Sequence, residues 1–249
     1  MKMASSIRYK TRPDLRHPVI IEGLPGVGNV GKLAADLIAK KLNAVHFADI
    51  ASSDLPPQIL VDDDCVVKNL RNELWAADAG EYDIVFILGD AQATTPSGQH
   101  DLTEFTLRAL LPYDPSMIIT LGGYGIGNLP VEPRVLGTVT DAALKERFES
   151  AGVGFYPGEP KGGIVGAAAM FLVFGEDYGI PSACIMGETS GYIVDYRSAK
   201  YVIQSLCAIL GVDIDTSDYD ESVTVIENAS DAPPEDAIQA PAEDLSYIR

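Results

Sequence analysis

The chain has 249 residues, a length that suits one large α/β domain or two small ones, and 47% of its residues are hydrophobic. Its formal net charge of −18 disfavours binding to nucleic acid or to an anionic membrane through bulk charge. No apolar run is long enough to span a membrane, the amino terminus lacks the apolar region of a secretory signal, and three cysteines lie far apart. These features predict a cytoplasmic protein with reduced thiols.

The charge is unevenly distributed along the chain. From Val212 to the end there are eleven acids and a single base. After residue 226, proline, alanine and acidic residues dominate, a composition that cannot bury enough apolar surface to fold. We therefore expect a single α/β domain over residues 1–226 and a flexible acidic tail over residues 227–249.

The first half of the chain begins with alternating strands and helices. The apolar run 17–23 predicts a buried strand, and apolar residues at helical spacing predict a helix over 29–42. Residues 44–50 predict the next strand, which would complete a strand–helix–strand unit suited to parallel pairing. Residues 58–78 hold short extended runs without a helical period, and we expect a hairpin or meander there.

The second half continues the alternation. Apolar runs predict strands at 83–90, 116–127, 134–141 and 181–189. Helices are expected at 97–111, after Asp141 through Ser150, at 162–179 (apolar on every side and therefore buried) and at 197–210. The pattern predicts a three-layer α/β sandwich whose sheet is mostly parallel, with an antiparallel section contributed by 58–78.

The segment "EGLPGVGNVGKLAADLI" (22–38) satisfies two phosphate-binding patterns. Gly26, Gly28 and Gly31 spell the dinucleotide fingerprint G-x-G-x-x-G, and Gly26 to Lys32 match seven of the eight P-loop positions. The segment follows a predicted strand and opens a predicted helix, as both motifs require. A nucleotide-binding loop is thus one interpretation.

Asp49 and Asp90 support that interpretation, because they are the acids that a nucleotide site would use for ribose or metal. Two observations favour a structural role instead. Leu33 stands where a P-loop has the Ser or Thr that holds Mg²⁺, and Leu24-Pro25 separate the strand from the first glycine. We interpret the glycines as structural, in this loop and in a second strand-end turn: Gly26, Gly28, Gly31, Gly122, Gly123 and Gly125.

The other candidate sites lack the residue patterns of a metal-binding or catalytic site. Asp62-Asp63-Asp64 reads as a solvated hairpin tip, and the three histidines lack partners at metal-binding spacing. Ser190 lacks the G-x-S-x-G elbow of a nucleophilic serine. The residues predict no catalytic group, no metal and no cofactor.

An ordered series of motifs resembles a known family. "EGLPGVGNVGKLAADLI", "LGD", "TLGGYG", "KGGIVGAAAMFL", "GETSGYIVDYRSA" and "LCAILGVDID" occur in the order seen in archaeal-type members of the proteasome assembly chaperone family. The resemblance covers residues 20–214. It implies an α/β sandwich similar to the nucleoside phosphorylase-type fold, a homo-oligomer, and a non-enzymatic role in assembling proteasome core-particle subunits, with the α-ring as partner.

The same resemblance gives the tail a role. Proteins that dock on proteasome α-rings often end in a hydrophobic residue, Tyr and one last residue. This chain ends "DLSYIR", with Ile248 where Tyr is expected, so the motif is shifted by one. The candidate docking residues are Leu245, Tyr247, Ile248 and Arg249. A chain end of accidental composition is the alternative. For the whole protein the alternatives are a nucleotide-dependent enzyme using Gly26–Lys32 and, by fold analogy, a small-molecule hydrolase or phosphorylase.

Overall fold

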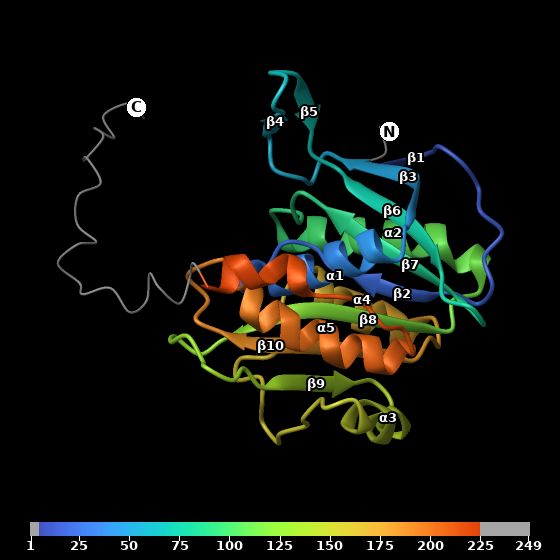
Figure 1. Cartoon of the computed structure of the whole chain (residues 1–249). Helices are drawn as coiled ribbons and strands as arrows, with labels where there is room; N and C mark the ends of the chain where they lie inside the picture. Colours follow the sequence, from blue (N-terminus) through green and yellow to red (C-terminus); the bar gives the residue numbers. More distant parts are fainter. Residues whose placement is uncertain (1–4, 225–249) are drawn as a thin grey trace, which may run out of the picture.

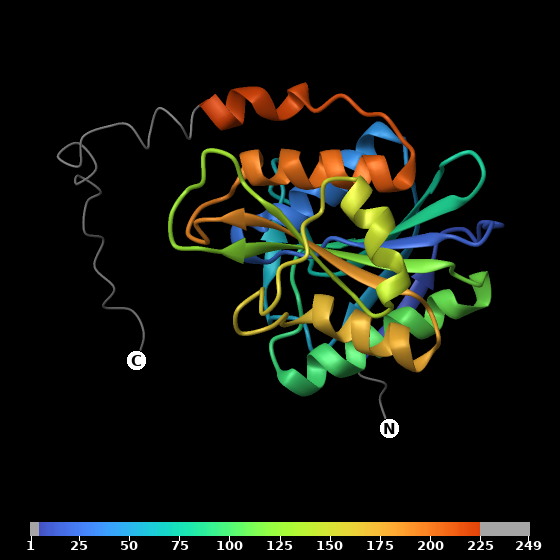
Figure 2. The same cartoon turned by 90° about the horizontal axis from the view of Figure 1, so that it is seen from below.

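The computed structural model describes residues 5–224, which form an eight-stranded sheet between helices (Figures 1 and 2). The strand order is β1 (Ser5–Tyr9), β3 (Val45–Ser52), β6 (Asn72–Asp78), β7 (Asp83–Gly89), β2 (Val19–Glu22), β8 (Met117–Gly125), β10 (Ser182–Thr189) and β9 (Val135–Val139). A separate hairpin, β4 (Ile59–Val61) and β5 (Val67–Asn69), projects from the body beside β1 and β3.

Helices cover both faces of the sheet (Figure 2). One face is covered by α1 (Val30–Lys41) and α5 (Tyr196–Leu210), and the other by α2 (Pro96–Leu110) and α4 (Ala167–Asp177). The short helix α3 (Lys145–Ser150) packs against α5. Single 3₁₀ turns are found at Val27–Asn29, Leu111–Tyr113, Ala142–Leu144 and Ser217–Tyr219. The predicted three-layer α/β class is confirmed.

The sequence pattern predicted a mostly parallel sheet, and the structure shows that this prediction is wrong. Parallel pairing joins β7, β2, β8 and β10 at its centre, whereas β1, β3, β6 and β7 on one side, and β10 with β9 on the other, pair antiparallel. The predicted unit of strand, helix and strand over 17–50 is present, but β3 does not pair with β2. Strands β7 and β6 lie between them.

Local sequence sets the helix boundaries. The Thr95 hydroxyl and the Asp195 carboxylate cap α2 and α5 by accepting hydrogen bonds from backbone amides at 3.0 and 2.9 Å, and Asp141 caps the turn that leads into α3. Gly211, with φ of 67°, ends α5. The helix expected from residue 162 begins only at Ala167, because residues 162, 163 and 166 are glycines with positive φ.

The core consists of two apolar clusters, one on each side of the sheet. The cluster under α1 and α5 contains Phe86 and Phe148, and the cluster under α2 and α4 contains Phe47 and Phe171. Helix α4 was expected to be buried on every side. It buries only one stripe, and Val173 remains 47% exposed. No helix among residues 5–224 is long and apolar enough to cross a membrane.

Candidate protein-interaction site

The carboxyl ends of β2, β8 and β10 lie side by side, and the loops that follow them meet at this edge. The Ile126 amide donates to the Thr189 carbonyl at 2.9 Å, and the Asp195 amide donates to the Gly28 carbonyl at 2.9 Å. In open parallel sheets this edge is where ligands most often bind. We therefore consider it the candidate functional site.

The first glycine loop is shaped by close packing. Gly28 and Asn29 have φ of 60° and 51°, the left-handed region that favours glycine and asparagine. A β-carbon on Gly31 would lie 2.3 Å from the Leu121 carbonyl oxygen, and one on Gly123 would lie 2.2 Å from the carbonyl oxygen of Val27. These contacts explain glycine at positions 28, 31 and 123.

The other three predicted glycines have no such steric reason. A β-carbon on Gly26 would meet nothing within 4 Å, and on Gly122 and Gly125 the nearest atoms lie at 3.5 and 3.6 Å, which is ordinary van der Waals contact. The structure thus gives half of the predicted structural glycines a packing role.

The groups that a nucleotide site would use are not assembled around the loop. The Lys32 ammonium does not turn into the loop: it donates to the Gly89 carbonyl at 3.1 Å and pairs with Asp36 at 3.0 Å. Asp49 lies on β3, which β6 and β7 separate from β2, and it pairs there with Arg8 at 2.9 Å. Asp90 follows β7 and is exposed. Lys32 is therefore a half-buried residue whose ammonium group makes contacts within the fold.

A buried carboxyl group lies directly beneath the loop. Glu22 is 1% exposed; its Oε1 accepts a hydrogen bond from the Leu24 amide at 3.1 Å, and its Oε2 has no partner. Burial raises the pKa of Glu22 to about 8. Its cross-strand neighbours are Thr120 and then Cys184, whose thiol pKa burial raises to about 12. This polar row is closed to solvent and is not a reactive site at neutral pH.

A second ion pair ties the outer strand to this edge. The Arg134 guanidinium donates through Nε to Glu188 at 2.8 Å, pairs with Glu159 at 3.2 Å and stacks on the Tyr156 ring. Burial alone would raise the pKa of Glu188, but the hydrogen bonds from Arg134 hold it below its ordinary value. The group orients the segment 156–160 against β10.

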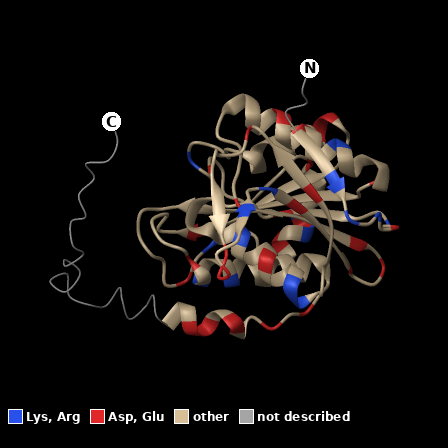
Figure 3. Cartoon of the chain, turned by 90° about the horizontal axis from the view of Figure 1, so that it is seen from above, with Lys and Arg blue, Asp and Glu red and all other residues tan. Residues whose placement is uncertain are grey.

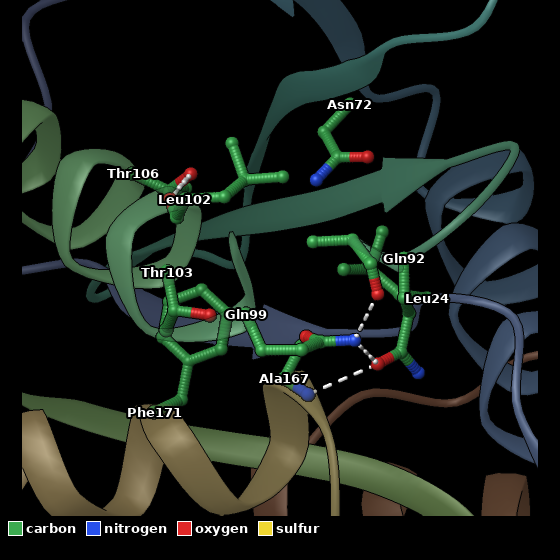
Figure 4. A pocket seen from close by; sticks show the side chains of 10 residues that line it. Leu24, Asn72, Gln92, Gln99, Leu102, Thr103, Thr106, Ala167 and Phe171 are labelled. Atoms are coloured by element: carbon green, nitrogen blue, oxygen red, sulfur yellow. Dashed lines mark hydrogen bonds between the residues drawn. The ribbon is translucent and has the colours of Figure 1, made fainter. Parts of the chain in front are cut away.

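Gln92 joins the glycine loop to both helices of the opposite face. Figure 4 shows its contacts with Gln99 and Ala167. Its amide nitrogen donates to the Pro25 carbonyl at 2.8 Å, and its oxygen accepts from the Ala167 amide at 3.0 Å and the Gln99 amide at 3.1 Å. The cavity beside it measures only about 10 Å³, the size of a single water site. This cavity cannot hold a small-molecule substrate.

No histidine lies at this edge to act as a base for Ser190. His17 pairs with Asp114, His46 lies on β3, and His100 packs against Phe174. The Ser190 hydroxyl instead accepts a hydrogen bond from the Tyr192 amide at 3.3 Å. The arrangement gives no support to nucleophilic catalysis there.

One histidine–carboxylate group was missed by the sequence analysis because its members come from two strands. His46, Asp49 and Glu73 place potential ligand atoms within 4.8 Å of one another. Arg8 and Arg71 pair with the same carboxylates, and the Lys10 ammonium lies 2.7 Å from His46 Nδ1. Three positive charges against two carboxylates disfavour a cation. Asp62–Asp64, as expected, form the tip of the β4–β5 hairpin.

Exposed apolar side chains surround the site. Tyr192 is 84% exposed and Val131 80% exposed, and further exposed apolar residues lie on the neighbouring loops: Val27, Tyr156, Val165, Ile193 and Val194. A surface of this kind is typical of protein–protein contact. The last described residues, 220–224, continue the turn at Ser217–Tyr219 as a helix that reaches the same end of the molecule in both views (Figures 1 and 2). The predicted docking residues Leu245, Tyr247, Ile248 and Arg249 lie outside the described residues.

The chain is similar to known archaeal proteins in sequence and in fold. The chain is 35% identical over 220 residues to MJ1210 of Methanocaldococcus jannaschii, covering 88% of this chain and 84% of that protein. Its fold is similar to Pyrococcus furiosus PbaB, an archaeal proteasome activator, with a TM-score of 0.85 and 35% identity over 91% of this chain and 97% of that chain.

Similarity extends to P. furiosus PbaA, an archaeal homologue of proteasome-assembly chaperone, with a TM-score of 0.72 and 25% identity over 90% and 94% of the two chains. The PAC2 family model matches residues 20–232. The chain belongs to the PAC2 family, in which the motif series had placed it as a proteasome assembly chaperone homologue.

Proposed function

We propose that this protein is a non-enzymatic adaptor that self-associates and binds proteasome core-particle subunits at the α-ring, promoting their assembly or activity. The observation that carries the proposal is the match to PbaB along nearly the full length of both chains. The exposed apolar loops around Val131 and Tyr192 supply a contact surface on the folded body. All three cysteines are free, which supports the expected cytoplasmic location.

The C-terminal segment would supply a second contact. The described part of the chain ends at residue 224, at the same end of the molecule as the apolar loops. Residues 227–244 contain acids but no base, so we propose that repulsion by the acidic body keeps this segment available as a tether. A chain of 18 residues would have an r.m.s. span of about 20–25 Å as a flexible coil. Tyr247 and Ile248 could then fill apolar pockets while the terminal carboxylate meets a lysine. Several tails of one oligomer would bind more tightly than one.

The test is capture of purified archaeal proteasome α-subunits and assembled core particles by the immobilised full-length protein. We expect capture to fall at least tenfold when Leu245–Arg249 are deleted and when Tyr247→Ser and Ile248→Ser are combined, with the oligomer unchanged. Ser246→Ala is the matched control. Equal capture by the truncated protein would assign binding to the folded body. No capture by the full-length protein would contradict the proposal.

The nucleotide-dependent alternative is separable by calorimetry with ATP, NAD and Mg²⁺. Because Lys32 is engaged by Gly89 and Asp36, we expect no binding at micromolar concentration. Saturable ATP binding that Lys32→Ala abolishes would favour the enzyme instead.

A further inference from the structure

The β4–β5 hairpin carries an apolar face with nothing on it among the described residues. Ile59, Val61 and Val67 share one face of the hairpin and are 53%, 63% and 61% exposed. Leu60 lies on the opposite face and packs against the core. The hairpin therefore turns one side to its own body and leaves three β-branched side chains exposed on the other. Figure 1 shows the hairpin projecting from the body.

A two-stranded hairpin is marginally stable alone, and its apolar face is a surface that other chains can cover. At its tip, Asp63 and Asp64 are exposed and form no ion pair with the described cations. Asp62 is already engaged by Lys68 at 3.2 Å and by the amide of Val66 at 2.8 Å. The hairpin thus combines an apolar face with an unneutralised acidic tip.

The complementary charge lies at the edge strand β1. Residues 8–16 contain four bases and one acid in a chain of net charge −18, and the basic residues near β1 are visible in Figure 3. The Arg8 side chain is 77% exposed, and Lys10 and Arg12 are exposed. Strand β1 pairs only with β3, so its outer backbone edge is open.

A hollow lies beside these basic residues. It has a volume of about 280 Å³ and is lined by Ser6, Arg8, Asp49, Ala51, Asn69, Leu70 and Arg71. Helix α1 packs over β7, β2, β8 and β10 rather than over β1 and β3, which leaves this part of the sheet accessible. The hollow is lined by the exposed Ala51 and by Leu70, which is only 8% exposed, beside Arg8 and Arg71, which both pair with Asp49.

We propose that the hairpin of one copy of this chain docks on the β1 edge of a second copy, with its apolar face in the hollow and Asp63 and Asp64 beside Lys10 and Arg12. Because one chain carries both halves of the contact, two copies related by a twofold axis make it twice and close a dimer. Opposite charges at the rim specify this pairing and penalise like-with-like contacts. The inference identifies the surface for the self-association in the proposed function, and it rests on that part of the proposal alone.

Charge reversal and mixing test the pairing directly. One variant carries Lys10→Glu and Arg12→Glu, and the other carries Asp63→Lys and Asp64→Lys. Analytical ultracentrifugation at low micromolar concentration should show that each variant alone has a particle mass at least twofold lower than that of the wild-type protein. An equimolar mixture should restore it, because each reversed hairpin then faces a reversed strand. Circular dichroism verifies that each variant is folded.

The apolar face is tested separately with Val61→Ser and Val67→Ser combined, which should lower the mass as the charge variants do. Val173→Ser is the matched control, because this valine is 47% exposed and lies on α4, outside both proposed contact surfaces; it should leave the mass unchanged. Wild-type mass in both charge variants, or variants that lose mass and are not rescued by mixing, would overturn the proposal. Since only purified chains are used, failure of proteasome capture leaves this result unaffected.

Discussion

The first turn of α1 lies so close to β8 that a β-carbon on Gly31 would stand 2.3 Å from the carbonyl oxygen of Leu121. We predict that Gly31→Ala destabilises the protein by about 2 kcal/mol, although alanine is favoured by about 1 kcal/mol over glycine within a helix, because overpacking dominates. Urea unfolding provides the measurement. Gly26→Ala is the control and should change stability little, since nothing lies within 4 Å of its added β-carbon. Equal effects at both positions would contradict the packing explanation.

Lys32→Ala should lower the free energy of unfolding by about 1 kcal/mol, because it removes a charged donor from the Gly89 carbonyl and leaves the half-buried Asp36 unpaired. Burial already raises the pKa of Asp36. Lys40→Ala on the same helix is the control: its side chain is 72% exposed, so the change should stay within about 0.5 kcal/mol. A smaller loss at Lys32 than at Lys40 would count against the assigned contacts.

Glu22 should make stability fall as pH rises. Its folded pKa of about 8 lies above its ordinary value of 4.5, so its proton stabilises the folded state fully below pH 4.5, and that contribution is lost as pH rises through 8. We predict that Glu22→Gln gains stability relative to wild type between pH 5 and 9, by up to a few kcal/mol, since each pKa unit corresponds to about 1.4 kcal/mol. If the free energies of unfolding of wild type and Glu22→Gln change with pH in the same way over this range, the buried carboxyl is not the titrating group.

The Arg134–Glu188 pair should contribute less to stability as the pH falls, which is the opposite of the pH dependence expected for Glu22. Arg134→Met leaves Glu188 buried without its cation and should cost about 2 kcal/mol at pH 7. Because the folded pKa of Glu188 lies below its ordinary value, the wild-type contribution is present above about pH 4.5 and is lost as pH falls through the folded pKa. A double-mutant cycle with Glu188→Gln, measured at a series of pH values below 7, tests this. Coupling that does not weaken as the pH falls below about 4.5 would disprove an ionic origin.

Local patterns in the sequence located most elements, because buried strands such as β8 are continuous apolar runs and helices such as α5 end at a glycine. The pairing partners of the strands could not be predicted from such local patterns. The neighbours of β3 are decided by competition among strands, and no local pattern records that β6 and β7 lie between it and β2.

The same limit applied to the site. The glycine loop was found from the spacing of its glycines. The contact of Lys32 with Gly89, in contrast, depends on how close β7 lies to α1. Arg134 and Glu188 are 54 residues apart, and Gln92 acquires its role only where α2 and α4 converge. The acidic tip of the hairpin was predicted from the sequence, but strand β1 and the role of the basic residues near it were not.

The position of β2 has a consequence for the order of folding. It ends at Glu22, but its two neighbours begin only at Asp83 and Met117, so the centre of the sheet closes through long loops. During synthesis the apolar run Val19–Ile21 must remain without one partner until β8 has left the ribosome. Contacts of such high sequence separation make folding slower than local helix formation would allow. A chain interrupted before Met117 would therefore leave the fully buried strand β2 without one of its two neighbours, and such fragments should be recovered mainly as aggregates.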